Sequence, residues 1–79
     1  MVYRERLYDI RLENRLRQAD IAAVLDTTKQ SYSCYENGKR KLGIEDLILL
    51  CKHYNLCSDY ILGLADERRP LRDEAQENG

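Results

Sequence analysis

The chain has 79 residues, which allows one small domain with one modest core. Hydrophobic residues make up 43% of it and charged residues 34%, which is typical of a soluble globular protein, and no stretch approaches the ~20 apolar residues of a membrane span. The net charge of −1 conceals an asymmetry, because residues 1–41 carry nine Lys or Arg against six Asp or Glu, whereas residues 42–79 carry four against eight. This asymmetry suggests that one face meets a polyanion while the other faces solvent or a partner.

The pattern predicts five short helices and no strands. The first two are expected at about residues 4–14 and 18–25. Their apolar positions recur at helical spacing, at Leu7 and Ile10 in the first helix and at Ile21, Ala22 and Leu25 in the second. Each of these helices therefore has one face to bury.

A turn and a cap separate the second helix from the third. Asp26 tolerates turn conformations, and the hydroxyl of Thr28 can accept a backbone N–H at a helix start. The third helix is therefore expected at residues 29–37, with Gly38 ending it and a basic loop following at residues 39–41.

The fourth and fifth helices are expected at residues 44–54 and 58–62. Gly43 begins the fourth, Asn55 is suited to end it, and Gly63 ends the fifth. The apolar face of the fourth helix comprises Ile44, Leu47, Leu50, Cys51 and Tyr54. From residue 66 the chain is polar, so we expect a domain at residues 1–65 and a mobile or partner-dependent tail at 66–79.

The third helix has two contrasting sides. Thr28, Ser31, Tyr32 and Tyr35 share the side expected to pack on the core, whereas the opposite side comprises Lys29, Gln30, Ser33, Cys34 and Asn37. The second side is rich in short hydrogen-bonding groups and has no carboxylate, which suits the major groove of DNA. An ordinary solvated helix face would show the same pattern.

The stretch LRQADIAAVLDTTKQSYSCYENGKRK, residues 16–41, closely resembles the helix-turn-helix family of lambdoid phage repressors and Cro, often called the XRE family. The resemblance extends from about Leu7 to Gly63. It is carried by Gln18, Ala22, Tyr32, Tyr35, the ENGK run at 36–39 and the DYILG run at 59–63. It implies an all-α, five-helix, lambda-repressor-like DNA-binding domain.

The resemblance also implies a role for each matching residue. The base-reading positions are Lys29, Gln30, Ser33 and Cys34. The phosphate-binding positions are Gln18, Thr28, Asn37, Lys39, Arg40 and Lys41. Arg17, which cannot serve as the usual cap of the second helix, is interpreted as an additional phosphate contact. Arg11 and Glu36 match a buried ion pair that ties the first helix to the third.

The sequence departs from the family pattern at several places. Arg17 replaces the usual Thr or Ser cap, Asp26 stands where Gly is common, and Gly43 follows Leu42 where Pro-Ser is common. The two tyrosines of the third helix are bulkier than the usual aliphatic residues, and each hydroxyl needs water or a partner.

Metal binding and catalysis are poorly supported. Cys51, His53 and Cys57, with Cys34, invite a metal interpretation, but they lack the paired spacing of a tetrahedral zinc site. The single His and the absence of a Gly-rich loop give no catalytic arrangement, so we expect neither an enzyme nor a cofactor. The odd number of cysteines and the absence of an apolar run in MVYRERLYDI favour reduced thiols in a cytoplasmic protein.

We therefore predict a regulator that binds double-stranded DNA, represses transcription from a palindromic operator and acts as a homodimer. Ile48, Leu49, Leu56 and Leu64 are the candidates for the dimer contact. One alternative is a protein-interaction module of the same fold, antitoxin-like or an accessory factor. Another is a control protein that also activates.

Overall fold

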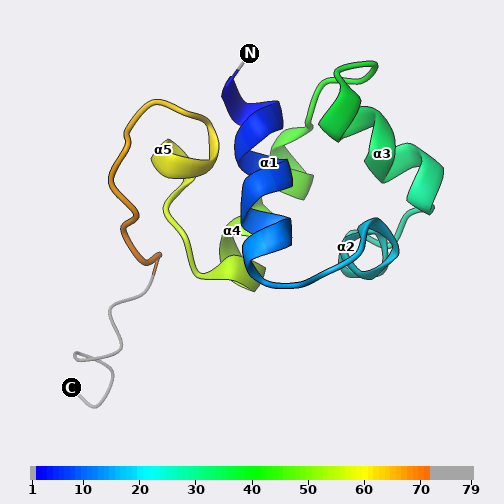
Figure 1. Cartoon of the computed structure of the whole chain (residues 1–79), viewed down its shortest axis with the longest axis horizontal. Coiled ribbons are helices and arrows are strands. Elements are labelled where there is room, and N and C mark those ends of the chain that lie inside the picture. Colours follow the sequence, from blue (N-terminus) through cyan, green and yellow to red (C-terminus); the bar gives the residue numbers. More distant parts are fainter. Residues whose placement is uncertain (1, 72–79) are drawn as a thin grey trace.

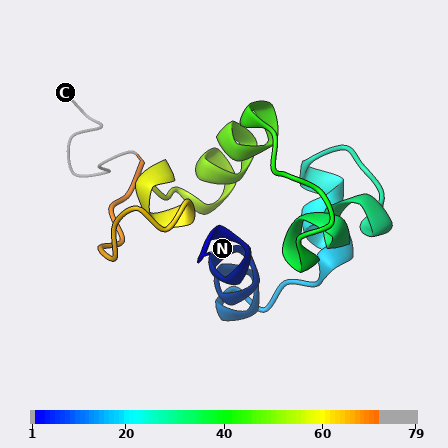
Figure 2. The same ribbon diagram turned by 90° about the horizontal axis from the view of Figure 1, so that it is seen from above.

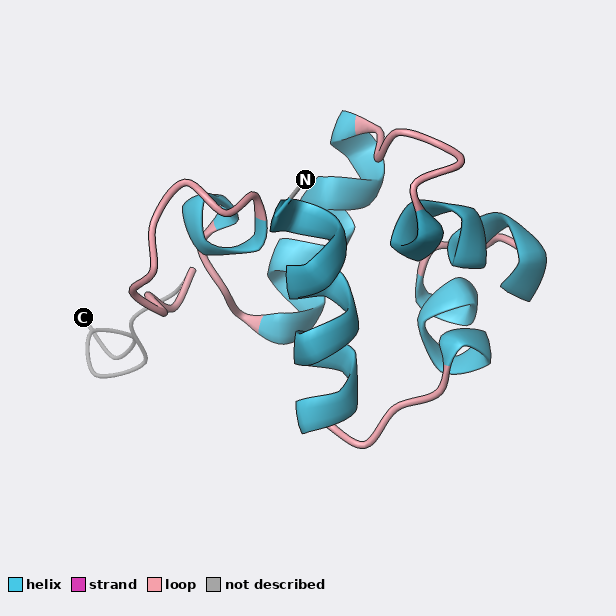
Figure 3. Cartoon of the chain, turned by 45° about the horizontal axis from the view of Figure 1, so that its top comes forward, coloured by secondary structure: helices cyan, strands magenta, loops and turns pink. Residues whose placement is uncertain are grey.

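The computed structural model describes residues 2–71, and the predicted end of the tail, residues 72–79, lies outside them. Over this range the chain is helical without strands, as predicted (Figure 3). The helices are α1 (Val2–Glu13), α2 (Gln18–Val24), α3 (Lys29–Asn37), α4 (Ile44–Tyr54) and α5 (Ser58–Ile61). This confirms the all-α, five-helix fold class.

Two ends of the domain flank a central pair of helices. α1 and α4 lie in the middle, α2 and α3 form one end, and α5 with the segment after it forms the other (Figures 1 and 2). α3 packs on α2 and α1, and α5 packs on α1 and α4. The core between them is made of the predicted stripes, with these residues buried: Leu7, Ile10, Ile21, Ala22, Leu25, Tyr32, Tyr35, Leu50, Cys51, Tyr60 and Ile61.

Two predicted core positions, Thr28 and Ile44, are wrong because both are exposed. Ile44 is 76% exposed, although it shares the apolar stripe of α4. The reason is its place at the first position of α4, because this turn projects beyond the neighbouring helices. A Cβ atom added to the preceding Gly43 would have no neighbour within 4 Å, which shows how open this end is.

The connection from α2 to α3 forms as predicted. Asp26 has a left-handed backbone, with φ 56°, which an Asp tolerates better than most residues. The N–H of Thr27 donates to the carbonyl of Ala22 at 2.9 Å, and the hydroxyl of Thr28 accepts from the N–H of Ser31 at 3.1 Å. α3 then begins at Lys29 and stops at left-handed Gly38, with φ 85°.

The starts of α2 and α4 lack a side-chain cap, as expected. Arg17 offers no acceptor to α2, but the Asp20 carboxylate accepts from the backbone N–H of Arg17 at 2.8 Å and so satisfies one group at this end. Gly43 has no side chain to cap α4, although Glu45 and Asp46 place negative charge in its first turn.

The described part of the predicted tail, residues 66–71, lies against the domain. It returns along α5, where the guanidinium of Arg68 donates to the hydroxyl of Tyr60 at 3.0 Å. The carbonyl of Arg69 accepts from the N–H of Cys57 at 2.7 Å. Composition does not predict this return, because the return depends on hydrogen bonds with two groups elsewhere in the fold. These groups are the N–H of Cys57, just before α5, and the hydroxyl of Tyr60 in α5.

The two glycines that flank the α3–α4 loop should respond oppositely to serine. Gly38→Ser should lower the free energy of unfolding by about 1–2 kcal/mol, because a Cβ is unfavourable in a left-handed backbone. Gly43→Ser should raise it by about 0.5 kcal/mol, because its φ of −79° and ψ of 161° suit a capping hydroxyl. Urea denaturation checks both; equal effects would contradict the assigned conformations.

Candidate nucleic-acid interface

The outer face of α3 carries the predicted base-reading residues. Lys29 and Gln30 are exposed in its first turn, and Ser33 and Cys34 are half-buried one turn further along. The opposite side is anchored by Tyr32, which is buried in the core. The segment is therefore an exposed helix whose polar side projects away from the protein body.

A shallow groove runs beside this face, with a volume of about 320 Å³. It brings together the four predicted base-reading residues and three of the predicted phosphate contacts. Its lining comprises Gln18, Lys29, Gln30, Ser33, Cys34, Asn37 and Lys39. Among the described residues no carboxylate lines it, so on this part of the surface a polyanion meets cations and uncharged side chains.

Two other predicted phosphate contacts lie at helix starts outside the groove. Arg17 precedes α2, and its side chain is 84% exposed, with the carboxylate of Asp20 3.6 Å from its Nε. Thr28 precedes α3, is exposed, and uses its hydroxyl to cap the helix. Both flank backbone N–H groups at the positive ends of helices, a favourable place for an anion.

Arg40 and Lys41 lie in a different hollow, of about 440 Å³, on the side of the loop that faces α1. Tyr3 and Arg4 complete this hollow together with Gly38 and Leu42. Five of the seven predicted phosphate contacts are thus divided between two neighbouring depressions, and Arg17 and Thr28 lie outside both. The residues from α1 were not identified from the sequence, because no local motif connects them to a loop so distant along the chain.

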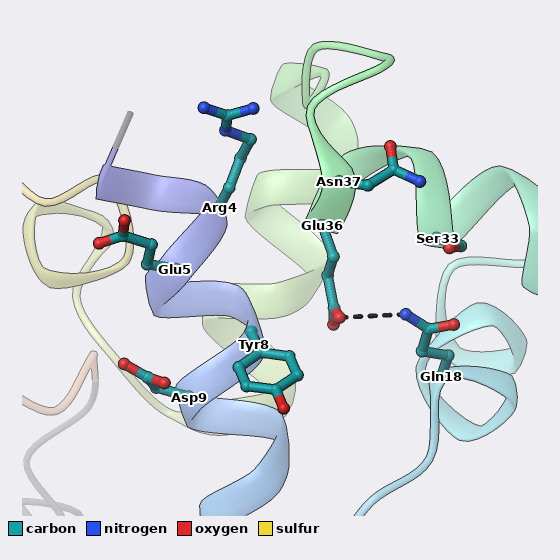
Figure 4. Close-up of a pocket in the computed structure, with 8 residues that line it drawn as sticks. All are labelled: Arg4, Glu5, Tyr8, Asp9, Gln18, Ser33, Glu36 and Asn37. Carbon is teal, nitrogen blue, oxygen red and sulfur yellow. Dashed lines mark hydrogen bonds between the residues drawn. The ribbon is translucent and has the colours of Figure 1, made fainter.

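A buried ion pair connects the helices behind the interface. The Arg11 guanidinium donates to Glu36 through Nε at 2.8 Å and Nη2 at 3.1 Å, and these side chains are only 9% and 5% exposed. The hydroxyl of Tyr32 donates to the same carboxylate at 2.6 Å. Gln18 donates to it through Nε2 at 3.1 Å, as Figure 4 shows. Glu36 therefore joins α1, α2 and α3 at one point.

Charge in this cluster is stabilised at neutral pH. Burial acts to raise the pKa of Glu36, but hydrogen bonds from Arg11, Tyr32 and Gln18 outweigh it and hold the pKa below its usual value of 4.5. The hydrogen bond to Glu36 raises the pKa of Arg11. Burial, followed by the hydrogen bond to Glu36, raises the pKa of Tyr32. The cluster thus holds one carboxylate, one guanidinium and one neutral hydroxyl.

The hydroxyl of Tyr35 has a partner that the sequence did not identify. It donates to the carboxylate of Asp46 in α4 at 2.7 Å. Asp46 stands in the first turn of α4, so this hydrogen bond fixes the far end of α3 to the start of α4. Both tyrosines of α3 thus donate their hydroxyl to a carboxylate, Tyr32 to Glu36 and Tyr35 to Asp46.

The three cysteines are free thiols, with Cys51 buried and Cys34 and Cys57 half-buried. Within residues 2–71, no three side chains of His, Cys, Asp or Glu gather closely enough to hold a metal ion. No helix in the described part of the chain has the length and apolar character needed to cross a membrane.

The matching segment identifies the family. Residues 7–61 match the helix-turn-helix family, and because this is well over half of the chain, the protein belongs to that family. The resemblance drawn from residues 16–41 is thereby confirmed.

Two relatives extend this assignment. Over 69 residues the chain is 33% identical to YobD of Bacillus subtilis (strain 168), described as an uncharacterized HTH-type transcriptional regulator, and the match covers 87% of this chain and 62% of YobD. The chain thus spans less than two thirds of that relative. The crystal structure of a transcriptional regulator from Listeria innocua superposes with a TM-score of 0.76 at 26% identity, covering 96% of this chain and 69% of that chain.

Replacing Glu36 tests how far the domain depends on the buried pair. Glu36→Gln should lower the free energy of unfolding at pH 7 by about 3 kcal/mol or more, because it leaves the Arg11 charge buried without its partner. The double variant Arg11→Met with Glu36→Gln should be more stable than Glu36→Gln alone, because no unpaired charge remains. Chemical denaturation of both variants checks this, and a double variant less stable than the single one would contradict it.

The lowered pKa of Glu36 also predicts how the stability difference between wild type and Glu36→Gln depends on pH. The folded-state pKa of Glu36 lies below its unfolded value, so its stabilisation is present above about pH 4.5 and is lost as pH falls through the folded pKa. The stability difference between wild type and Glu36→Gln should therefore narrow on acidification. A difference that stays constant from pH 7 to pH 3 would be inconsistent with the lowered pKa.

Proposed function

We propose that this protein is a cytoplasmic transcriptional regulator that binds double-stranded DNA with α3 in the major groove. The observation that carries the proposal is the exposed side of α3, whose groove is lined by hydrogen-bonding side chains, two lysines and, within residues 2–71, no carboxylate. Phosphates repel carboxylates and attract cations, and base edges require donors and acceptors. The relatives described as transcriptional regulators support the same function.

Base reading is assigned to the first half of α3. The amide of Gln30 can pair with N6 and N7 of adenine, and the ammonium of Lys29 can donate to O6 and N7 of guanine, each worth about 1–3 kcal/mol of discrimination. Ser33 and Cys34 follow one turn later, where Ser33 contributes a hydroxyl and Cys34 a contact to a thymine methyl group. Since Lys29 and Gln30 are exposed, they reach a groove without rearrangement of the core.

Phosphate binding is assigned to residues around the reading face. Gln18 donates one Nε2 hydrogen to Glu36, which fixes the amide and leaves the other hydrogen for a phosphate. The Oδ1 atom of Asn37 accepts from the N–H of Lys39 at 3.0 Å, so its Nδ2 group remains a donor. The remaining contacts are Arg17, Thr28, Lys39, Arg40 and Lys41.

A homodimer on a palindromic operator is the assembly we propose. One α3 covers only half a site, and two placed about 34 Å apart read both halves from one side of the duplex. Ile48 and Leu49 on α4 and Leu64 after α5 are exposed apolar residues suited to such a contact. Leu56 packs against the core instead, so it contributes less than the sequence suggested. A dimer that occupies a promoter excludes the polymerase and so represses.

The same exposed apolar residues leave a second candidate open, a protein-interaction module such as an antitoxin-like or accessory factor. In that case the partner would be a different protein, and DNA affinity would not depend on α3. Full DNA affinity in a Lys29→Ala plus Gln30→Ala variant would favour this function. Activation in addition to repression would depend on where the operator lies relative to the promoter.

A fluorescence titration against a randomised duplex and against an operator selected from a random pool tests the proposal. We expect the selected operator to bind at least about a thousand-fold more tightly, the usual margin of specific over non-specific binding. Its sequence should be an inverted repeat, and sedimentation of the complex should give two protomers per duplex. Equal affinity for both duplexes would exclude sequence-specific regulation, whereas one protomer per selected duplex would exclude only the dimer.

Two single variants separate reading from anchoring. Gln30→Ala should relax the preference at one base pair in each half-site, because it removes a bidentate base contact. Lys39→Ala should weaken binding to all duplexes alike and reduce the slope of log affinity against log salt by about 0.9, because one phosphate contact is lost. Titrations at several salt concentrations measure both effects. An identical, sequence-independent loss in the two variants would contradict the division.

A further inference from the structure

We infer that Arg4 is an additional DNA-backbone contact, which extends the phosphate-binding surface from α3 and its following loop onto the first turn of α1. This inference rests on the proposed function. It assigns a residue far from the helix-turn-helix segment to a phosphodiester of the same operator. Arg4 lies outside residues 7–61, the range over which the family match extends.

The fold places Arg4 directly against the end of α3. Its guanidinium lies over Gly38, so that a Cβ atom at Gly38 would overlap Nη1 and stand 2.9 Å from Cζ. The adjacent Tyr3 holds this arrangement, because its hydroxyl accepts from the backbone N–H of Leu42 at 3.3 Å. The start of α1 and the basic loop are therefore joined, and Arg4 projects beside the residues assigned to phosphate.

One side of Arg4 is cationic, and the cleft on its other side is mixed in charge, because the carboxylates of Glu5, Asp9 and Glu36 also line it. Arg4 shares one hollow with Arg40 and Lys41 and a neighbouring cleft with Asn37. Figure 4 shows Arg4 and Asn37 on the same side of the cleft. A phosphate held by Asn37 or the basic loop would thus lie near the guanidinium of Arg4.

Arg4 also differs from the other arginines of α1. Arg6 pairs with Asp66 at 3.0 Å, and Arg11 pairs with Glu36. Within residues 2–71 the structure records no ion pair or hydrogen bond for the Arg4 side chain. A guanidinium without a carboxylate partner at the edge of a basic hollow is suited to bind phosphate.

Two carboxylates on α1 line the same cleft, and a phosphate that approached them closely would be repelled. Glu5 and Asp9 point away from α3 in Figure 4, on the opposite side of α1 from Tyr8. A backbone that follows α3 and its loop would meet Arg4 before it meets these two residues. The alternative role of Arg4 is purely structural, as a cation at the negative end of the α3 dipole.

Affinity and its salt dependence test the inference on the selected operator and on a randomised duplex. Arg4→Gln should weaken binding to both by about five- to ten-fold at 0.1 M salt and reduce the salt slope by about 0.9, the effect of one lost phosphate contact. Arg4→Lys should keep most of the slope, because the charge remains. Lys52→Gln is the matched control, since it removes one positive charge from the exposed surface of α4 and should leave the slope unchanged.

Replacing single phosphates of the operator with uncharged methylphosphonates gives a second test. It distinguishes a phosphate contact of Arg4 from a purely structural role. One methylphosphonate is placed at each position of the selected operator in turn. At one position in each half-site, this change should weaken the binding of the wild type and leave the binding of Arg4→Gln unchanged. Additive losses at every position, or a salt slope for Arg4→Gln equal to that of Lys52→Gln, would overturn the inference and leave the proposed function standing. A wild-type protein that binds no DNA would overturn both.

Discussion

The buried pair between Arg11 and Glu36 is the constraint on which the rest of this structure depends. A carboxylate only 5% exposed requires compensation, and it finds it in a guanidinium, a tyrosine hydroxyl and an amide from three helices. Holding Glu36 inward fixes the rotation of α3 about its axis, and so decides which side faces outward. Because Gln18 belongs both to this cluster and to the outer groove, the core and the proposed DNA contact share its amide side chain.

The two ends of the domain carry different chemistry. The end formed by α2, α3 and the following loop holds the predicted cations and the two hollows (Figure 1). At the other end, the guanidinium carbons of Arg6 and Arg68 lie 4.1 and 5.1 Å from the ring centroid of Tyr60. Together with the ion pairs of Arg6 with Asp66 and of Arg68 with Glu13, those contacts connect segment 66–71 to α1 and α5.

Signals that act over a few residues were readable directly from the sequence. The bounds of α3 follow from the Thr28 hydroxyl and the left-handed glycine at position 38, and the end of α4 follows from Asn55, whose φ is 53°. Each depends on backbone geometry that the residue itself favours, so no distant contact is needed. The stripes that became the core were readable for the same reason, since helical periodicity alone decides which side chains share a face.

Tertiary structure alone decided the features that depend on distant partners. The exposure of Ile44 follows from where the neighbouring helices stop, and the return of 66–71 follows from polar groups made available near α5. The hydroxyl of Tyr35 found Asp46, and Arg4 came to rest on Gly38, across long stretches of chain. No local pattern encodes such pairs, because their formation depends on the packing of whole helices rather than on the preferences of either residue. The sequence by itself therefore determined which segments are helical and which faces are buried, and packing decided which charges meet at the surface.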